Sequence, residues 1–470
     1  MTDPDPRRWR ALAVTQAAGF MSLLDVSIVN VALPSMQADL GAGAGGIQWV
    51  VSGYALTFGL SLVAGGRLGD ALGRRRMFLV ALSVFVLTSA LAGAAPNLTW
   101  LVLARLAQGL AGGLLTPQNS GLIQDLFQGA ERGKAFGVLG ATIGISTAVG
   151  PIAGGLILAW FGDPQGWPWV FYVNLPIGLV ALVLAMRLLP KDRPTGRADI
   201  DLVGALLLGA TVLAVLLPLV RADSGGLTSL WWLFPLAIAL GWLFLRWERH
   251  LVRRGRAPLL DLRLFTETPG YVAGAGIGLA YFCGFSGIWL VFAVFFQAGL
   301  GYTPLESGLA VTPFAIGSAV AAAVAGRLVD RWGRLITVLG LTAVGVGLAA
   351  VAVVLLVVPG NAAGAWIAVP MVLAGVGGGA VISPNTTLTL TSVPNRLAGV
   401  AGGVLQTGQR IGTAVGTATL AAVFYAVLGG TGRYPAAIAV ALFAAVTLVA
   451  VAFALAVRDL RMARRVPQGG

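Results

Sequence analysis

Long apolar segments recur along the whole sequence, and they limit its fold more than any other feature does. Each is about 18–25 residues long, which lets a helix cross a hydrocarbon core roughly 30 Å thick. Only 10% of the 470 residues are charged, against about 25% in a typical soluble domain. We therefore predict an all-α integral membrane protein with 14 transmembrane helices. The predicted spans lie near residues 11–33, 47–66, 77–95, 99–122, 135–160, 169–189, 202–220, 230–247, 271–298, 305–326, 335–358, 364–390, 398–426 and 434–457.

The positions of the basic residues support this count. With the N-terminus in the cytoplasm, 27 of the 31 Lys and Arg residues fall in cytoplasmic segments, which is the bias typical of membrane proteins. The alternation predicts a multi-pass protein of the cytoplasmic membrane with both termini cytoplasmic. It also accounts for the net charge of +13, so we expect no nucleic-acid partner. The partners that we expect are the lipid bilayer, protons and a small-molecule substrate, bound by a monomer.

Composition argues against several kinds of chemistry. One Cys and one His rule out a disulfide framework and argue against a Cys/His metal site, so we expect no cofactor. The pattern Gly-x4-Gly-Lys-Ser/Thr does not occur, so ATP hydrolysis at such a loop does not power the protein. Three arginines precede the first span and Asp25 interrupts it. We therefore expect that span to be a retained anchor and not a cleaved signal peptide.

Asp25 lies in the middle of the first apolar segment. A charged side chain at membrane depth costs about 2.5–3.5 kcal/mol on insertion scales, so an acid there indicates a functional site. At 100° per residue Asp25 shares a helix face with Ala18, Ser22 and Ala32. Because these side chains are small, we expect Asp25 to face a water-filled cavity.

Two loops in the sequence repeat one motif. Residues 66–74 read Gly-Arg-Leu-Gly-Asp-Ala-Leu-Gly-Arg, and residues 326–334 read Gly-Arg-Leu-Val-Asp-Arg-Trp-Gly-Arg, with six of nine positions identical. Each copy follows an apolar segment, and duplicated halves are common in secondary transporters. Glycines permit the sharp turn, while the Asp and Arg suit neighbouring helix ends.

Eight spans separate the two copies, so two spans are inserted between halves of six. We predict an N-terminal six-helix bundle over residues 1–198 and a C-terminal six-helix bundle over residues 266–470. Residues 199–265 then form a two-helix insert with a basic cytoplasmic linker.

Five stretches are typical of one family of membrane proteins. Three of them are residues 24–34 (Leu-Asp-Val-Ser-Ile-Val-Asn-Val-Ala-Leu-Pro), the paired loops, and Arg105 with Gln108-Gly109; the others are residues 150–155 (Gly-Pro-Ile-Ala-Gly-Gly) and 167–176 (Trp-Pro-Trp-Val-Phe-Tyr-Val-Asn-Leu-Pro). On these stretches the chain resembles the major facilitator superfamily and, within it, the 14-span drug:proton antiporters. The resemblance implies two pseudo-symmetric six-helix bundles plus two inserted helices. Pro168 departs from the pattern, because the family usually has a basic residue there.

The glycine-rich run in span 5 resembles the motif found in exporters of this family. Pro151 removes a backbone hydrogen bond, and Gly150, Gly154 and Gly155 allow another helix to approach closely. We predict a hinge that seals one side of the membrane, with a kinked packing helix as the alternative. The candidate gating residues are Gly66, Asp70, Gly73, Arg74, Asp125, Gly150, Pro151, Gly154, Gly155, Asp330 and Arg334.

Arg105 is the basic residue whose predicted depth in the membrane is closest to that of Asp25. Counting along the helices places Arg105 about 12 Å and Asp25 about 14 Å below the outer surface. In the family both spans line the central cavity, so an alternating salt bridge is possible. We expect proton coupling at Asp25 and Arg105, because protonation of the acid would release the guanidinium. The alternative is a permanent ion pair that only holds the first bundle together.

The second half offers fewer charged candidates within its spans. Arg410 lies about 18 Å from the cytoplasmic side and requires an acceptor, which is a backbone carbonyl, a nearby glutamine or an anionic substrate group. Aromatic side chains suit an amphipathic pocket, although packing or contact with lipid is the alternative. The candidate substrate-binding residues are Ser22, Tyr54, Gln108, Tyr281, Trp289, Phe292, Phe296, Gln406 and Arg410.

Together these features predict a proton-coupled antiporter that exports small lipophilic or amphipathic compounds, such as drugs or antibiotics, by alternating access. A transporter of a lipid, peptide or sugar is the first alternative. A membrane-embedded glycosyltransferase is the second, but short loops and a single His argue against it.

Overall fold

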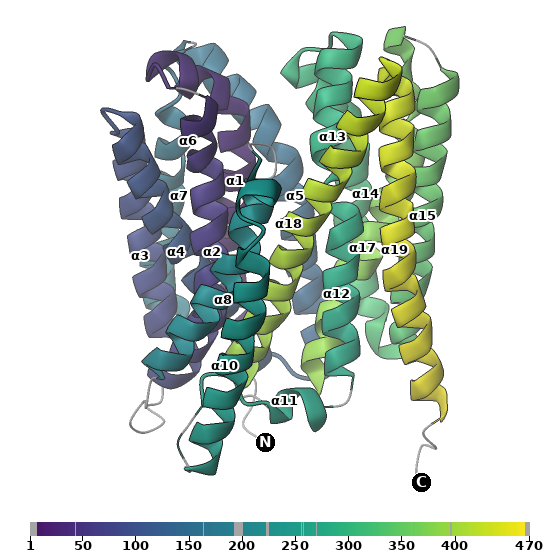
Figure 1. Ribbon diagram of the computed structural model, residues 1–470. Helices are drawn as coiled ribbons and strands as arrows, with labels where there is room; N and C mark the ends of the chain where they lie inside the picture. The colour runs from purple at the N-terminus through teal and green to yellow at the C-terminus, as the bar shows by residue number, and fades with distance from the viewer. Residues whose placement is uncertain are drawn as a thin grey trace. The chain divides into compact units, whose positions relative to one another are not determined.

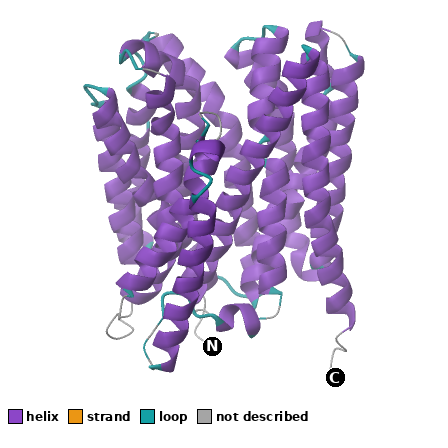
Figure 2. Cartoon of the chain, viewed as in Figure 1, coloured by secondary structure: helices purple, strands orange, loops and turns teal. Residues whose placement is uncertain are grey.

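The structure is a computed structural model that describes residues 7–42, 44–162, 164–191, 201–221, 225–254, 256, 258–268, 270–358, 360–394 and 397–465. Within these ranges every regular element is a helix (Figures 1 and 2). The all-α prediction is confirmed for this part of the chain.

The helices up to residue 268 begin with the long α1 and end with the short α11. Their bounds are α1 Arg8–Asp39, α2 Ala44–Leu72, α3 Arg74–Gly93, α4 Leu98–Leu126, α5 Ala130–Phe161, α6 Trp169–Tyr172, α7 Asn174–Leu188, α8 Leu202–Val220, α9 Gly226–Ser229, α10 Leu233–Arg253 and α11 Arg263–Thr266.

The later helices include one short π-helix, η2, and one 3-10 turn, η3. Their bounds are α12 Tyr271–Phe285, α13 Ile288–Val294, η2 Phe295–Gly299, α14 Pro304–Trp332, α15 Arg334–Val357, η3 Gly360–Ala362, α16 Ala363–Trp366, α17 Ala368–Thr391, α18 Ala398–Thr431 and α19 Tyr434–Arg465.

Local sequence explains where several helices begin. Asn97 precedes α4, and its side chain accepts a hydrogen bond of 2.9 Å from the Trp100 backbone N–H. Before α14, Thr303 and Glu306 form a capping box, in which each side chain accepts a hydrogen bond from the other residue's backbone N–H. These caps satisfy N–H groups that have no partner within the helix.

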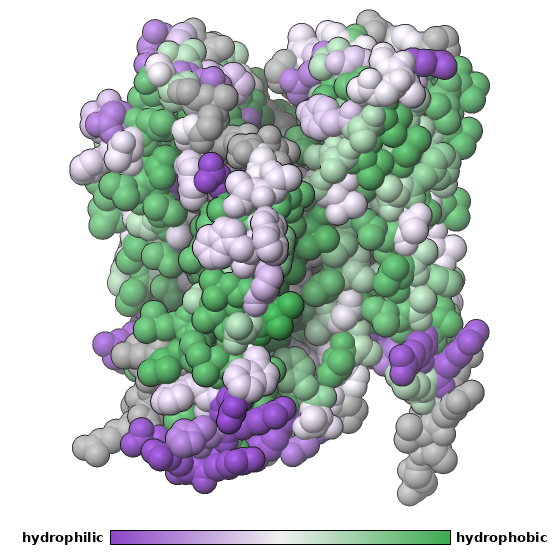
Figure 3. All heavy atoms as spheres, in the orientation of Figure 1, coloured by the Kyte–Doolittle hydropathy of each residue, from purple (hydrophilic) through white to green (hydrophobic). Residues whose placement is uncertain are grey.

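In the described part of the chain, 11 helices are long and apolar enough to cross a membrane. Two shorter apolar helices, Ile152–Phe161 and Val203–Leu219, add to them. All of the predicted spans fall on described helices, although α10 is not among those 11. Apolar side chains cover the flanks of the helices in Figure 3, while hydrophilic residues gather at the lower ends of α10 and α19. The protein is a multi-pass membrane protein.

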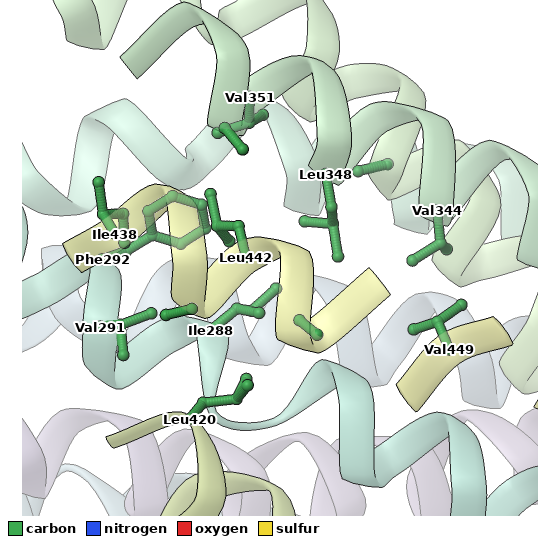
Figure 4. Packing of buried hydrophobic residues seen from close by; sticks show 14 of the residues in the cluster. Ile288, Val291, Phe292, Val344, Leu348, Val351, Leu420, Ile438, Leu442 and Val449 are labelled. Atoms are coloured by element: carbon green, nitrogen blue, oxygen red, sulfur yellow. The ribbon is translucent and has the colours of Figure 1, made fainter. Parts of the chain in front are cut away.

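Contacts divide the chain into two compact units. The first unit contains Met1–Phe127, Val149–Thr268 and Val393–Thr407, and the second contains Gln128–Ala148, Pro269–Ser392 and Gly408–Gly470. The helices α5 and α18 therefore each contribute to both units. The second unit has a large apolar core, in which Ile288, Leu348 and Leu442 are completely buried (Figure 4).

The two repeated loops have the same backbone design. Gly73 ends α2 with φ of 100°, and Gly333 ends α14 with φ of 49°. Residues other than glycine rarely adopt such angles, so the glycines set both turns. A Cβ on Gly399 of α18 would lie 2.6 Å from the Gly66 carbonyl oxygen. The matching Cβ on Gly133 of α5 would lie 2.5 Å from the Gly326 carbonyl oxygen. Each loop thus requires glycine against a neighbouring helix, as expected of a duplicated element.

The glycines of α5 differ in their surroundings. A Cβ on Gly150 would collide with Ser27 of α1, and one on Gly154 would lie 3.1 Å from the Val31 Cβ. Among the described residues, no atom of another segment lies within 4 Å of a Cβ built on Gly155, so the close helix approach predicted there is wrong. The side chain of Pro151 lies outside the described residues.

These surroundings make Gly150→Ala and Gly155→Ala a matched pair of variants. Overpacking a tight contact costs about 1–3 kcal/mol, so Gly150→Ala should lower the unfolding temperature of the purified protein. Gly155→Ala should leave it nearly unchanged. Thermal unfolding in detergent, followed by tryptophan fluorescence, measures both. Equal effects of the two variants would contradict the α1–α5 contact.

Candidate functional site

A buried ion pair lies within the first unit. Asp25 of α1 is 0% exposed and Arg105 of α4 is 1% exposed. The distance from Arg105 Nη1 to Asp25 Oδ2 is 2.5 Å. The structure therefore brings together the two charged residues whose predicted depths in the membrane match.

Arg105 has several further partners. Its Nε donates a hydrogen bond of 3.0 Å to the Val50 carbonyl oxygen of α2, and its Nη1 donates one of 2.7 Å to Gln108 Oε1. The Tyr54 ring lies 4.2 Å from the guanidinium carbon and the Phe171 ring lies 5.6 Å from it. Ring faces attract cations more strongly where water is excluded. The guanidinium is thus enclosed by neutral groups as well as by the acid.

Asp25 accepts hydrogen bonds at both carboxylate oxygens. Besides Arg105 on Oδ2, Gln108 Nε2 donates a hydrogen bond of 3.0 Å to Oδ1 and Asn174 Nδ2 donates one of 2.8 Å to the same oxygen. Both carboxylate oxygens of Asp25 are thus engaged by donors from α4 and α7.

Two further residues of this site, Asn174 and Ser89, are not among those predicted from the sequence. Asn174 begins α7, is completely buried, and donates from Nδ2 to both Asp25 and Ser89 Oγ of α3, the latter at 2.9 Å. Ser89 donates in turn to the Phe171 carbonyl oxygen at 3.0 Å. An amide within the apolar stretch of residues 169–189 was a visible signal, because buried polar side chains require partners.

The expectation that Asp25 faces a water-filled cavity is wrong for this conformation. Ala18, Ser22 and Ala32 do lie on its side of α1, but they are 0%, 4% and 0% exposed. Ala18 and Ala32 pack in apolar clusters with residues of neighbouring helices. Asp25 is enclosed by residues of α4 and α7.

Three predicted substrate contacts belong to the surroundings of this ion pair. Gln108 bonds to Asp25 directly, and Tyr54 stacks on Arg105. Ser22 lies 3.4 Å from the Tyr54 hydroxyl. All three are buried, so none is open to a ligand in this conformation.

The aromatic candidates of the second unit are mostly packing residues. Phe292 and Phe296 are 1% and 0% exposed, and their rings stack 6.0 Å apart. Figure 4 shows Phe292 beside Ile438 within the apolar core. Tyr281 is buried as well, while Trp289 is half-buried and contacts Phe314 edge to face. The prediction that Phe292 and Phe296 line a pocket is therefore wrong in this structure.

Two polar candidates for substrate binding, Gln406 and Arg410, lie on α18 and are less buried than the aromatic candidates Phe292 and Phe296. Gln406 is half-buried, and its Nε2 donates a hydrogen bond of 3.3 Å to Ser120 Oγ of α4. Arg410 is also half-buried.

The first repeated loop has a dense charge network. Asp70 accepts hydrogen bonds of 3.1 Å from the backbone N–H groups of both Gly399 and Val400, at the N-terminus of α18. Arg74 pairs with Asp70 and with Asp125 of α4, each at 3.0 Å, and donates to the Gly121 carbonyl oxygen. An acid at a helix N-terminus is favourable because unpaired N–H groups and the helix dipole both face it.

The second loop uses different partners despite its similar sequence. Arg334 pairs with Asp459 of α19 at 2.6 Å and donates a hydrogen bond of 2.6 Å to Asn385 Oδ1 of α17. Asp330, which corresponds to Asp70, is exposed. The repeat therefore preserves the turn and the glycine contact but not the ion pairs.

Comparison with known proteins identifies the family. A model of the Major Facilitator Superfamily matches residues 17–417 and 274–468. The chain belongs to the major facilitator superfamily. Membership in this superfamily confirms the resemblance seen in the sequence, and it supports a transporter in place of an enzyme.

Two relatives in this superfamily have names that refer to antibiotics. The chain is 37% identical over 433 residues to a probable actinorhodin transporter of Streptomyces coelicolor, covering 91% of this chain and 74% of the relative. It is 38% identical over 444 residues to the puromycin resistance protein pur8 of Streptomyces alboniger, covering 92% and 84%.

A solved structure supports the fold. The crystal structure of the human organic anion transporter MFSD10 matches with a TM-score of 0.67, covering 96% of this chain and all of that chain. At 15% sequence identity this match shows the fold alone. The prediction of a major facilitator fold is confirmed.

We expect substitutions of Asp25 and Arg105 to have strongly coupled effects on the free energy of unfolding. Asp25→Ala should destabilise the protein by about 3–5 kcal/mol, because it leaves a buried guanidinium without its counter-charge. Adding Arg105→Met should restore part of that loss, so the two effects should not add. Unfolding in detergent with increasing denaturant measures the single and double variants.

The Asp261–Arg263 pair is a suitable control, because the Arg263 side chain is 55% exposed. Its double-mutant cycle should give a much smaller coupling than that of Asp25 and Arg105, because water screens an exposed ion pair. Additive losses at Asp25 and Arg105 would contradict an energetically coupled pair.

Proposed function

We propose that the protein is a proton-driven antiporter that exports small lipophilic or amphipathic compounds, antibiotics among them, by alternating access. Membership of the superfamily and the names of the two relatives support the cargo class. The observation that carries proton coupling is the Asp25–Arg105 pair, which is a titratable acid and a fixed cation enclosed together within the first unit.

The partners of Arg105 suit a cycle in which Asp25 gains and loses a proton. When the acid is neutral, the guanidinium retains the Val50 carbonyl, Gln108 Oε1 and the face of Tyr54. Arginine remains charged throughout, since it cannot be deprotonated in proteins. These neutral partners lower the cost of a buried cation without a paired anion.

Asn174 is suited to hydrogen-bond to Asp25 both before and after the acid gains a proton. Among the described residues its Oδ1 has no hydrogen-bond partner, while its Nδ2 donates to Asp25. An amide carries both a donor and an acceptor. A half-turn of this amide would present its oxygen to the O–H of a protonated Asp25. Asn174 can therefore pair with either form of the acid, whereas Arg105 can only donate.

The remaining parts of the proposal concern topology and cargo contacts. We assign 14 membrane crossings to a monomer in the cytoplasmic membrane, with both termini cytoplasmic, because the distribution of basic residues favours this topology. Trp289, Gln406 and Arg410 are the half-buried members of the predicted substrate set. They remain candidates for contact with the cargo.

Gradient-driven transport tests the proposal directly. Purified protein in liposomes with an acidic interior should accumulate radiolabelled puromycin or related amphipathic compounds, and a protonophore should abolish the accumulation. Asp25→Asn should reduce accumulation to the level of protein-free liposomes, because the replaced side chain cannot exchange a proton. Asn174→Leu should reduce it in part, since one partner of the acid is lost.

Two controls separate coupling from folding. Exchange of labelled for unlabelled substrate without a pH gradient should persist in Asp25→Asn, because this exchange requires no proton. Glu267→Gln, which changes an exposed acid, should transport like the unmodified protein. Normal gradient-driven accumulation by Asp25→Asn would remove that residue from the mechanism. Failure of the unmodified protein across a panel of such compounds would overturn the cargo class.

A further inference from the structure

A second pair of acids lies where the two inserted helices meet. Asp201 stands immediately before α8, and Glu248 lies near the C-terminal end of α10. The two helices pack against each other within the first unit (Figure 1). Glu248 lies just beyond the predicted span 230–247, and Asp201 lies just before the predicted span 202–220. This pair therefore stands apart from the membrane-embedded Asp25.

Asp201 is held in place by donors from both helices. Its Oδ1 accepts a hydrogen bond of 2.8 Å from the Gly204 backbone N–H, which caps α8. Trp247 Nε1 of α10 donates to the two carboxylate oxygens at 2.9 and 3.1 Å.

Only one of the two carboxyl oxygens of Glu248 has a hydrogen-bond donor among the described residues. Glu248 is 0% exposed, and its Oε2 accepts a hydrogen bond of 3.2 Å from the Leu260 backbone N–H in the linker that follows α10. Its Oε1 has no hydrogen-bond donor among the described residues. A Cβ on Gly204 would lie 2.7 Å from Glu248 Oε1 and closer still to Asp201 Oδ2, so the two carboxyl oxygens face the same small space.

The charges around Glu248 do not supply the missing donor. Arg67 of α2 acts on Glu248 through its charge, but its Nε has no hydrogen-bond partner among the described residues. Asp261, next to Leu260, is engaged with Arg263. Two ionised carboxylates that face each other without a donor are unfavourable, and one proton between them removes the repulsion.

We infer that Asp201 and Glu248 bind one proton between them, and that this proton fastens the linker after α10 to the start of α8. The proton resides on Glu248 Oε1 and is donated to Asp201 Oδ2. Glu248 Oε2 then holds the linker through the Leu260 N–H. The pair is thus a second protonation site, and its role does not depend on transport.

Burial raises the pKa of Glu248 to about 8, and the charge of Asp201 adds to this effect, while the Leu260 hydrogen bond and Arg67 oppose it. Because the folded state retains this proton more tightly than the unfolded chain, the stability it confers is fully present at low pH. That stability is lost as the pH rises through the folded pKa. Alkaline pH should therefore loosen the linker.

The Glu248→Gln variant tests the shared proton. Its amide N–H₂ would donate to Asp201 and its oxygen would accept from Leu260, which imitates the protonated acid without titrating. The unfolding temperature of the unmodified protein should fall as the pH rises from 4.5, the ordinary pKa of a glutamic acid, to the folded pKa of about 8. In Glu248→Gln this fall should be largely absent, while Glu267→Gln, an exposed acid in the same linker, should retain it.

Hydrogen–deuterium exchange of residues 258–268 provides a second measurement. At alkaline pH this segment should exchange faster in the unmodified protein than in Glu248→Gln, and Glu248→Ala should exchange fast at every pH. Parallel pH profiles for the unmodified protein and Glu248→Gln would overturn the shared proton. Loss of stability at every pH in both Glu248→Gln and Arg67→Met would also overturn it, because Glu248 would then be a charged partner of Arg67.

Discussion

The ion pair between Asp25 and Arg105 determines how the first unit is built. Two charges removed from water are tolerated only where hydrogen bonds replace their hydration, and here the replacement comes from four helices in addition to α1. Gln108 on α4 and Asn174 on α7 satisfy the carboxylate, while Val50 and Tyr54 on α2 satisfy the guanidinium. Ser89 on α3 holds Asn174. Each of these helices is thus linked to Asp25 by polar contacts, either directly or through Arg105 or Asn174.

The repeated loops show which parts of a duplicated element are physically constrained. A helix ending at positive φ and a backbone in close contact both demand glycine, so Gly73 and Gly333, like Gly66 and Gly326, occupy the same roles in both copies. Ion pairs can be made with any nearby partner of opposite charge. Arg74 accordingly pairs with Asp70 and Asp125, while Arg334 pairs with Asp459 on the last helix.

Features set by regular helical geometry could be predicted from the sequence, whereas features set by neighbouring helices could not. The rise per residue placed Asp25 and Arg105 at similar depths, which is why their contact could be expected. It could not show that Asn174 completes the site, since α7 reaches Asp25 only through tertiary packing. Phe292 and Phe296 were placed in a pocket because core and cavity aromatics have the same helical spacing. Gly155 was grouped with Gly150, although the two residues point to different surroundings on α5.

We propose that Asp25 exchanges its proton as cargo binds. Proton release can be counted with a pH indicator when puromycin is added to purified protein in weakly buffered detergent solution. We expect release by the unmodified protein and none by Asp25→Asn, provided that both bind the compound. Equal release by the two proteins would contradict it, because the exchanged proton would then belong to another group.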